Sequence, residues 1–524
     1  MNVVKKALIS VSKKEGLTGF AEGLRSLNVE LISTGGTAKF LKDHGFKAQE
    51  ISDYTGFPEI LNGRVKTLHP KVHGGLLGIR DNPEHVRQMS QNGICPIDLV
   101  VVNLYPFEET TRKPGVSFDE VIENIDIGGP SMVRSAAKNF RDVAVLVDPE
   151  DYVWALQELK STGGSLSLES RFKLAQKAFQ HTASYDASIA EHLSRLSESH
   201  GTIEAVGGMF PKTLFLSLDK IVDLRYGENP HQRAAFYREN SPYDAVLPDA
   251  RQLQGKELSF NNIIDLNAAY QLSREFETTC AVIIKHTNPC GVALSVVSQS
   301  DAYVKARACD PLSAFGSVLG FNRPVEKETA QEIALTFVEA IIAPAYSSEA
   351  LQLLAPKKNL RLLEINNTPT HFHPFDYKRV EGGLLLQEVD RIPISEEEWK
   401  VVTLRSPTPD EWEGLKFAWQ VVKHIKSNAI VYAKAMQTAG IGAGQMSRVD
   451  SAKIGISKAL LPIQGCVMAS DAFFPFRDGI DVAAEAGVCA VIQPGGSLRD
   501  GEVIQAANEH GLSMVFTGTR HFKH

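Results

Sequence analysis

Two segments combine cationic and imidazole side chains in a way that suits chemistry on an anionic substrate. The first, Gly63–Gly75, holds one arginine, two lysines and two histidines among glycine and proline, with no acidic residue. Such a concentration of positive donors is costly unless an anion binds there. We expect a loop, and a solvated basic loop is the plainer alternative. No carboxylate or thiol accompanies the histidines, which argues against a metal site.

The second segment, Val282–Gly291, is an apolar run that ends in Lys285 and His286 before an Asn-Pro turn. A neighbouring cation disfavours the imidazolium, so His286 would stay neutral and act as a general base near neutral pH. Lys285 would stabilise a developing oxyanion. The alternative is a strand end whose polar residues simply face water. A zinc-dependent base deaminase would show His-x-Glu followed by Pro-Cys-x-x-Cys, a pattern that this segment does not match.

Glycine-rich and polar turns add further candidate anion contacts. Ile32–Thr37 runs from an apolar strand through Gly-Gly into a helix, so backbone amides can approach a ligand closely, although ordinary strand-to-helix turns look the same. Asn103–Pro106 ends another apolar strand, and Ile125–Pro130 leads into a helix, since proline suits a first helical turn. Similar turns in the C-terminal part are Leu224–His231, Gly440–Arg448, Asp471–Asp478 and Pro494–Ser497.

The elements that must position these turns predict an α/β protein. Apolar strands are expected at Ala7–Val11, Val29–Ser33, Leu99–Asn103 and Val143–Val147, with helices between them. Short apolar strands separated by helices indicate a parallel sheet covered on both faces. Ligands of such sheets bind at the carboxyl ends of the strands. The polar clusters that follow the strands are therefore expected to form one phosphate site.

The chain divides into three predicted parts. Residues 1–150 form the first domain, residues 151–211 a helical linker with a long helix from Glu169 to about Glu198, and residues 212–524 a larger α/β domain with a seam at 391–413. A helix followed by a strand occurs at Asp265–His286 and again at Glu413–Tyr432. The strings at 310–315 and 470–476 look like counterparts. We therefore expect an internal duplication of the larger domain.

Composition narrows the class of protein. With 524 residues, 43% of them hydrophobic and 22% charged, the chain is typical of soluble proteins. A net charge of −7 argues against a non-specific nucleic-acid binder, and no apolar run is long enough to span a bilayer. The six cysteines show no CxxC spacing and fit a reducing cytoplasm.

Taken together, the motifs resemble one family over almost the whole chain. They are STGGT, RVKTLHPKVHGG, NLYPF, IDIGGP, RYGENPHQ, KHTNPCG, GIGAGQMSR, SDAFFPFRDG and the C-terminal RHFKH. The chain resembles the bifunctional purine-biosynthesis enzymes that join 5-aminoimidazole-4-carboxamide ribonucleotide (AICAR) formyltransferase to inosine monophosphate (IMP) cyclohydrolase. The resemblance implies a methylglyoxal-synthase-like parallel-sheet domain, followed by a larger, duplicated cytidine-deaminase-like α/β domain without zinc.

The resemblance also implies roles for particular residues of the N-terminal domain. Lys66, Tyr105, Asp126 and Lys138 would surround the closing ring, with proton transfer through Lys138 and Asp126 and charge stabilisation through Lys66. The nucleotide would be held by Ser12, Lys13, Lys14, Thr34, Gly35, Gly36, Thr37, Arg64, Thr67, Asn103, Leu104 and Ile127.

In the C-terminal domain, Lys285 and His286 would carry formyl transfer. The AICAR contacts would be Arg225, Tyr226, His286, Gly316, Glu339, Asn428, Arg448, Phe473 and Arg520. Some relatives have aspartate where this chain has Glu339, a change that keeps the acidity but alters the reach. Asp478 and the turn Gly495, Gly496 and Ser497 would lie beside the folate.

The implied reaction transfers the formyl group of 10-formyltetrahydrofolate to AICAR and then closes formyl-AICAR to IMP with loss of water. The resemblance implies a cytoplasmic homodimer with no catalytic metal and no nucleic-acid or membrane partner. Two alternatives stay open. One is a nucleotide-sensing regulatory module, against which the acid–base set of the N-terminal domain weighs. The other is a chain that keeps only one of the two activities.

Overall fold

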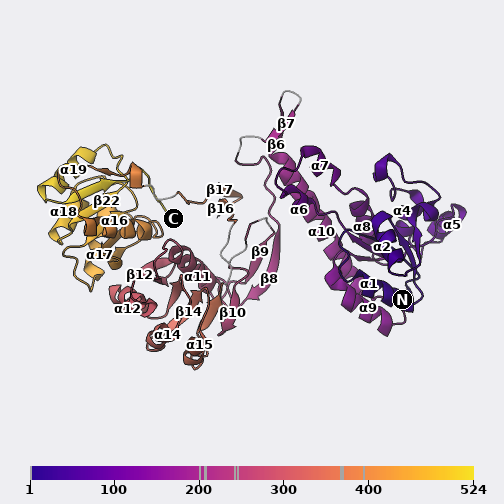
Figure 1. Ribbon diagram of the computed structural model, residues 1–524, viewed down its shortest axis with the longest axis horizontal. Coiled ribbons are helices and arrows are strands. Elements are labelled where there is room, and N and C mark those ends of the chain that lie inside the picture. Colours follow the sequence, from indigo (N-terminus) through magenta and orange to yellow (C-terminus); the bar gives the residue numbers. More distant parts are fainter. Residues whose placement is uncertain are drawn as a thin grey trace. The chain divides into compact units, whose positions relative to one another are not determined.

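The computed structural model describes residues 3–199, 202–205, 209–240, 243–244, 247–365, 371–392 and 396–524 (Figure 1). Its internal contacts divide the chain into two compact units, Met1–Ser217 and Leu218–His524. Part of the predicted seam, residues 393–395, lies outside the described residues. No helix in the described ranges has the length and apolar character that a bilayer crossing requires.

The N-terminal unit contains a five-stranded parallel sheet in the order β3-β2-β1-β4-β5. Its strands are β1 (Lys6–Val11), β2 (Glu30–Ser33), β3 (Ala48–Glu50), β4 (Leu99–Asn103) and β5 (Ala144–Leu146). Four of them confirm predicted strands, whereas the three-residue β3 was not predicted. Strand order reverses beside β1, whose neighbours are β2 and β4. Crevices at such a reversal are where ligands bind in open α/β sheets.

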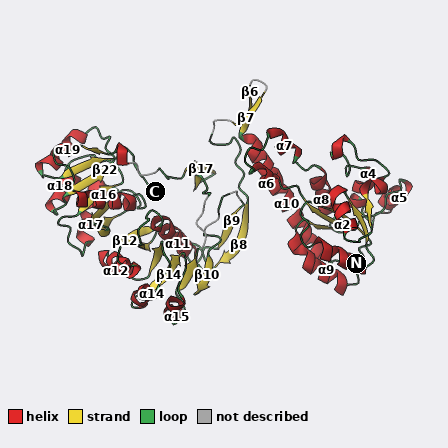
Figure 2. Cartoon of the chain, viewed as in Figure 1, coloured by secondary structure: helices red, strands yellow, loops and turns green. Residues whose placement is uncertain are grey.

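Helices flank this sheet, as Figure 2 shows in red. They are α1 (Leu17–Ser26), α2 (Gly35–Asp43), α3 (Ile51–Thr55), η1 (Leu61–Gly63), α4 (Pro70–Leu77), α5 (Pro83–Gln91), α6 (Phe107–Thr111), α7 (Phe118–Glu123), α8 (Gly128–Lys138), η2 (Pro149–Asp151), α9 (Tyr152–Ser161) and α10 (Leu168–Ser194). Ile9 and Val101 enter one buried cluster, whereas Leu8 and Val100 enter another. Alternate strand residues therefore pack on opposite faces, which confirms a parallel sheet covered on both sides.

Two segments of this unit differ from a simple reading of the sequence. The prediction of a loop over Gly63–Gly75 was wrong in its second half, because Pro70 begins α4 and the His69 ring accepts a hydrogen bond from the Lys71 amide at 3.1 Å. Proline is favoured at the first helical position, where its missing N–H costs nothing. The long helix α10 packs against α8 and β5, so most of the segment predicted as a linker lies within the compact N-terminal unit.

The C-terminal unit contains a twelve-stranded mixed sheet in the order β10-β15-β14-β13-β11-β12-β20-β19-β21-β22-β23-β18. Its strands are β10 (Arg251–Gln254), β11 (Cys280–Lys285), β12 (Asn288–Leu294), β13 (Ser317–Phe321), β14 (Val338–Ala343), β15 (Arg361–Glu364), β18 (Lys400–Val401), β19 (Ile430–Lys434), β20 (Gln437–Gly442), β21 (Val467–Ser470), β22 (Ala490–Gln493) and β23 (Ser513–Phe516).

The helices of this unit are α11 (Phe260–Ser273), α12 (Gln299–Cys309), α13 (Pro311–Ala314), α14 (Lys327–Ala334), α15 (Ser348–Leu354), η3 (Glu396–Glu398), α16 (Pro409–Val422), α17 (Arg448–Lys458), α18 (Asp478–Glu485) and α19 (Asp500–Glu509). Two further hairpins pair β8 (Leu218–Leu224) with β9 (Ala234–Glu239), and β16 (Phe375–Val380) with β17 (Gly383–Glu388). In the N-terminal unit, β6 (Leu196–Ser199) pairs with β7 (Thr202–Ala205).

The large sheet is a duplication, with a constant register in the strands β11, β12 and β13 and their counterparts β19, β20 and β21. The order β10-β15-β14-β13-β11-β12 recurs as β18-β23-β22-β21-β19-β20, and the two halves meet where β12 pairs with β20. Lys285 opposes Asn288 across the first hairpin as Lys434 opposes Gln437 across the second, and 434 − 285 = 149. The predicted duplication of helix and strand is thus present.

The pairing of the strings at 310–315 and 470–476 was wrong. Val318 opposes Ile284, and Val467 opposes Ala433, again 149 positions apart. Residues 310–315 precede β13, whereas residues 470–476 begin at the end of the equivalent strand β21. The two segments, although similar in sequence, therefore occupy different positions in the two copies of the sheet.

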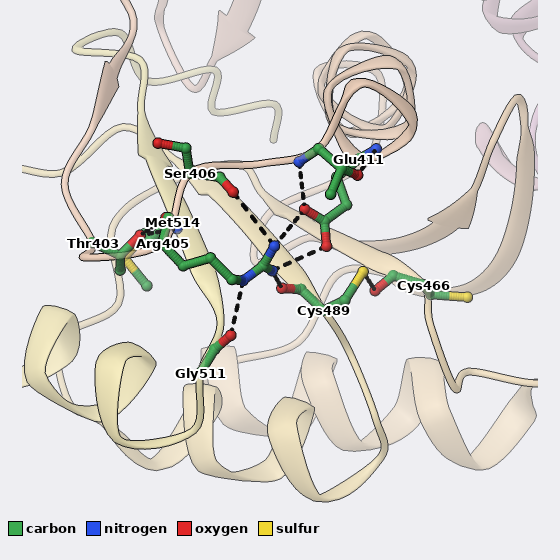
Figure 3. A network of polar contacts seen from close by, with 9 residues as sticks. Thr403, Arg405, Ser406, Glu411, Cys466, Cys489, Gly511 and Met514 are labelled. Carbon is green, nitrogen blue, oxygen red and sulfur yellow. Dashed lines mark hydrogen bonds and ion pairs between the residues drawn. The ribbon is translucent and has the colours of Figure 1, made fainter.

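A polar network fixes the start of the second copy (Figure 3). The Arg405 guanidinium donates to both carboxylate oxygens of Glu411, at 2.7 and 3.0 Å, to Gly511 O at 2.9 Å, and to the Cys489 carbonyl. Glu411 also accepts from the Thr408 amide at 2.8 Å, which completes a capping box at α16. The network therefore joins the N-terminus of α16 to the segments that begin β22 and β23.

Candidate functional sites

The first site forms where β1 and β4 end, at the strand-order reversal of the N-terminal sheet. The Ser12 and Lys13 amides donate to Asn103 Oδ1 at 2.5 and 3.0 Å. Ser12 Oγ lies 2.9 Å from that same oxygen and 2.8 Å from Leu104 O. The predicted residues after the two strands are thus held together in one turn cluster.

The Gly-Gly turn after β2 lies beside this cluster. Lys14 Nζ donates to Thr37 Oγ1 at 2.9 Å, and Ser10 Oγ lies 2.7 Å from Thr34 Oγ1. Burial lowers the pKa of Lys14. Gly35 and Gly36 are the first residues of α2, whose N-terminal amides carry partial positive charge. These contacts bring three of the predicted nucleotide-holding segments to one edge of the sheet.

Asp126 lies at the start of α8 and has an unusual environment. Burial raises the pKa of its carboxyl group, although hydrogen bonds from the Gly129 and Tyr105 amides and the charge of Lys66 oppose the increase. The Gly129 amide donates to Asp126 Oδ1 at 2.8 Å. A methyl group at Gly129 would lie 2.4 Å from Asp126 Oδ2, so the close approach requires glycine. Lys66, Tyr105 and Asp126 therefore lie close together.

Two neighbours complete the surroundings of Asp126. The Asp126 amide donates to the Tyr185 hydroxyl on α10 at 2.9 Å, a contact that sequence reasoning missed because no motif marks Tyr185. A methyl group at Gly128 would lie 2.4 Å from Thr67 Oγ1, so Thr67 lies against the first turn of α8. The next predicted residue, Ile127, is 59% exposed and opens toward solvent.

Three predicted cations of this unit lie apart from that group. Arg64 pairs with Glu123, and Lys13 with Glu109 at 2.8 Å. Lys138 is the last residue of α8, about 15 Å along the helix axis from Gly128 at 1.5 Å per residue. The next residue, Asn139, donates to Leu76 O at 2.8 Å, at the end of α4. Lys138 therefore lies at the opposite end of α8 from Asp126.

The second site is built on the turn between β11 and β12. Lys285 Nζ donates to Gly316 O at 2.8 Å and to Phe315 O at 3.2 Å. Both central residues of the turn, His286 and Thr287, are left-handed, with φ of 52° and 65°. Gly316 is also left-handed, with φ of 66°, and its amide donates to Phe337 O at 2.8 Å. The predicted Lys285, His286 and Gly316 are therefore brought together.

Other predicted AICAR contacts form a cluster in the second copy. Arg448 is only 7% exposed, donates to Asn428 Oδ1 at 2.8 Å and pairs with Asp471. The C-terminal tail reaches this cluster, since the His521 amide donates to Asp471 O at 3.1 Å, next to Arg520. The buried guanidinium thus already has a carboxylate partner and shapes the loop of Asn428.

One hydrogen bond joins this cluster to the β11–β12 turn, because the Lys426 amide donates to Asn288 Oδ1 at 2.9 Å. Glu339, Arg225 and Tyr226, which are also predicted AICAR contacts, make their contacts with other residues. Glu339 pairs with Arg361 at 3.3 Å, and the Arg225 guanidinium lies 5.6 Å from the Tyr226 ring centre, at the end of β8.

The predicted folate positions surround α18 and the loop after β22. Asp478 begins α18 and is exposed, and the rings of Phe473 and Phe476 are 37% and 47% exposed. The amides of Gly496 and Ser497 are already bound by Asp500, at 2.7 and 3.1 Å. Asp478 Oδ1 accepts a hydrogen bond from the Gly479 amide at 2.8 Å, so the other oxygen of this carboxylate and the exposed rings are the groups available to a ligand. Among the described residues there is no cluster of three histidine, cysteine or acidic side chains suited to a metal ion.

Comparison with known proteins identifies the family. The family model described as "AICARFT/IMPCHase bienzyme" matches residues 136–458, and the model "MGS-like domain" matches residues 16–131. A bifunctional purine biosynthesis protein PurH from Magnetococcus marinus is 55% identical over 100% of both chains. A solved structure titled "Crystal structure of ForH" is 41% identical, covering 36% of this chain and 95% of its own, with a TM-score of 0.34.

The full-length identity and the two matched models agree with the resemblance seen in the motifs. The chain thus belongs to the AICARFT/IMPCHase bienzyme family and is a bifunctional purine-biosynthesis enzyme with AICAR formyltransferase and IMP cyclohydrolase activities.

Proposed function

We propose that the C-terminal unit transfers a formyl group from 10-formyltetrahydrofolate to AICAR and that the N-terminal unit closes formyl-AICAR to IMP. The observation that carries this assignment is the separation of two acid–base groups, Lys285 with His286 in one unit and Lys66 with Asp126 in the other. Each group lies in a compact unit of its own, and each is built on its own sheet. The domain limits 1–150, 151–211 and 212–524 remain part of this proposal.

In the transfer step, His286 accepts the proton that the 5-amino group of AICAR loses as its nitrogen bonds to the formyl carbon. Lys285 stabilises the oxyanion, and a proton returns to the departing folate nitrogen, so that formyl-AICAR and tetrahydrofolate leave. The fixed position of Lys285 supports this role, because its ammonium donates to two carbonyl groups beside the turn. Preorganised donors stabilise developing charge without further rearrangement.

The residues beside α18 fit the pterin of the formyl donor. A flat heterocycle with amino and amide groups needs a ring face to stack on and an acceptor for its N–H groups, which Phe476 and Asp478 offer. When bound, this co-substrate supplies the formyl group. In this proposal AICAR lies against Arg225, Tyr226, His286, Gly316, Glu339, Asn428, Arg448, Phe473 and Arg520.

In the N-terminal unit, the Thr34–Thr37 turn, Ser12 and Lys14 hold the phosphate. Ring closure joins two groups of one molecule, so positioning supplies much of the rate. The carboxamide nitrogen attacks the formyl carbon and loses one proton, the 5-formamido nitrogen loses a second as the ring C=N bond forms, and the formyl oxygen takes up both protons and leaves as water. Asp126 takes the nitrogen proton, because a carboxyl group whose pKa is raised by burial is a stronger base than an exposed one. Lys66 stabilises the oxyanion, and Tyr105 lies beside them.

Lys138 remains a predicted participant at the ring, although within this chain it lies at the far end of α8. A homodimer is also proposed, since Leu312, Phe315, Leu335 and Phe337 are 85%, 65%, 76% and 46% exposed, and the Phe315 carbonyl accepts a hydrogen bond from Lys285. Such an apolar patch is typical of a surface that a partner covers. We place the enzyme in the cytoplasm, because its six cysteines are unpaired.

The test follows tetrahydrofolate release and IMP formation separately with the purified protein. Lys285→Ala with His286→Ala should abolish transfer from 10-formyltetrahydrofolate and leave closure of supplied formyl-AICAR unchanged. Lys66→Ala should slow closure of formyl-AICAR and leave transfer unchanged, and Lys138→Ala tests the fourth predicted residue. Binding of AICAR or IMP with neither reaction would favour the nucleotide-sensing alternative, and loss of only one reaction in the wild type would favour the single-activity alternative.

A further inference from the structure

The two copies of the large sheet keep the same lysine–glycine contact. A methyl group at Gly316 would lie 3.4 Å from Lys285 Nζ, and one at Gly465 would lie 3.5 Å from Lys434 Nζ. Both glycines are left-handed, and each donates its amide to a carbonyl at 2.8 Å, that of Phe337 or that of Gly487. This approach of lysine to glycine is thus common to both copies and does not by itself distinguish the proposed transfer site.

Two other positions differ between the copies. At the register of 149 residues, Ala435 replaces His286, and Gly414 on α16 replaces Asp265 on α11. The acid and the imidazole therefore occur together in the first copy and are both missing from the second. We propose that Asp265 is a positioning residue for formyl transfer, because its carboxylate holds the His286–Thr287 turn in the conformation that presents the imidazole.

The geometry of the turn supports this role. The Thr287 amide donates to Asp265 Oδ1 at 2.6 Å, and the carboxylate also accepts from the His286 amide. Both residues are left-handed, a conformation that residues other than glycine rarely adopt without support from their surroundings. In the second copy, only Ala435 of the two central residues has positive φ. Without the acid the turn therefore has a different shape.

Gly414 is close enough for a side chain to reach the second turn. A methyl group there would lie 3.8 Å from Ala435 O, and its nearest neighbours would be Val467 Cγ2 and Cγ1, at 3.2 and 3.5 Å. Position 414 therefore lies near the second turn with Val467 packed beside it, and of the two copies the one that has the histidine also has the acid. The hydrogen bonds described here join Asp265 to backbone amides of the turn. In the proposal, Asp265 therefore affects transfer by positioning His286.

The inference rests on the proposed role of His286, and the experiment separates the two. Formyl transfer and cyclisation are measured for the wild type, His286→Ala, Asp265→Ala and Asp265→Asn. The matched control is Asp301→Asn, an acid on α12 that accepts from Ser295 Oγ at 2.6 Å and lies in neither proposed site. Thermal unfolding of each variant reports on folding.

For Asp265→Ala we expect kcat of transfer to fall about 10- to 100-fold, since misplacing a catalytic group by about 1 Å has that effect. KM for AICAR and the rate of cyclisation should stay within about twofold. Asp265→Asn keeps one acceptor oxygen and should recover at least severalfold of the lost rate. Full transfer by Asp265→Ala with an inactive His286→Ala would overturn the inference alone. Equal loss in Asp265→Asn and Asp265→Ala would also overturn it. Full transfer by His286→Ala would overturn the proposed function itself.

Discussion

Gly316 and Gly465 offer a matched pair of substitutions that separates backbone strain from chemistry. Both have positive φ, at 66° and 75°, and both lie against a lysine ammonium group. Alanine in the left-handed region costs about 1–2 kcal/mol. Gly316→Ala and Gly465→Ala should therefore lower the free energy of unfolding by similar amounts, about 1–2 kcal/mol each.

Their effects on formyl transfer should differ. A methyl group at Gly316 would lie 3.3 Å from the Phe337 ring, a tight contact, and 3.4 Å from Lys285 Nζ. Relief of that contact and of the left-handed strain should displace the Gly316 carbonyl, which accepts a hydrogen bond from the Lys285 ammonium. A hydrogen bond to a charged group contributes about 1.5–3 kcal/mol, and each 1.36 kcal/mol corresponds to a factor of ten in rate. We expect kcat of transfer to fall about tenfold or more in Gly316→Ala. It should change by less than about twofold in Gly465→Ala.

The assay combines steady-state transfer kinetics with denaturant unfolding followed by tryptophan fluorescence. Trp399, Trp412 and Trp419 lie in the C-terminal unit and report on it, and Trp419 is fully buried. Equal losses of transfer in both variants would refute the reasoning, because they would mean that strain alone explains the effect. Wild-type transfer by a stable Gly316→Ala variant would refute the role assigned to the Lys285 contact.

Two further predictions concern charge. Lys66→Met removes a cation that lowers the pKa of Asp126, so the pKa of Asp126 should rise. The acidic limb of the pH profile of the cyclisation rate should then move to higher pH, whereas it should not move in the control variant Lys71→Met. An unmoved limb in Lys66→Met would contradict the prediction. Although burial alone raises the pKa of Glu411, hydrogen bonds from Arg405 and the Thr408 amide lower it overall. Its contribution to stability is therefore present above the ordinary carboxyl pKa and is lost as pH falls through the lowered value. Glu411→Gln should lower the free energy of unfolding by about 2–3 kcal/mol at pH 7, measured by urea unfolding. This loss is smaller than the loss expected on breaking a fully buried ion pair, because Arg405 is partly exposed. The difference between the variant and the wild type should shrink below about pH 4.

Much of the fold could be read from local patterns. Four parallel strands, the helices between them and the long helix α10 each follow from short runs of apolar residues and their spacing. The resemblance to the family rests on motifs of the same local kind. Two predictions were wrong. The segments 310–315 and 470–476 were paired because their residues are similar, although they lie at different positions in the two copies of the sheet. The basic, proline-containing segment was predicted as a loop, although α4 begins at Pro70.

The α/β class, the family and the segments that carry the chemistry follow from the amino-acid sequence, because strands, turns and motifs depend on neighbours along the chain. Which of those segments meet follows from the folded structure. It gathered Lys66, Tyr105 and Asp126, set Lys138 at the far end of α8, and brought Asp265 and Tyr185, which no motif marks, against the residues they support. The physical reason is that such contacts join residues far apart in sequence, and the path of the chain through the sheet sets their distances.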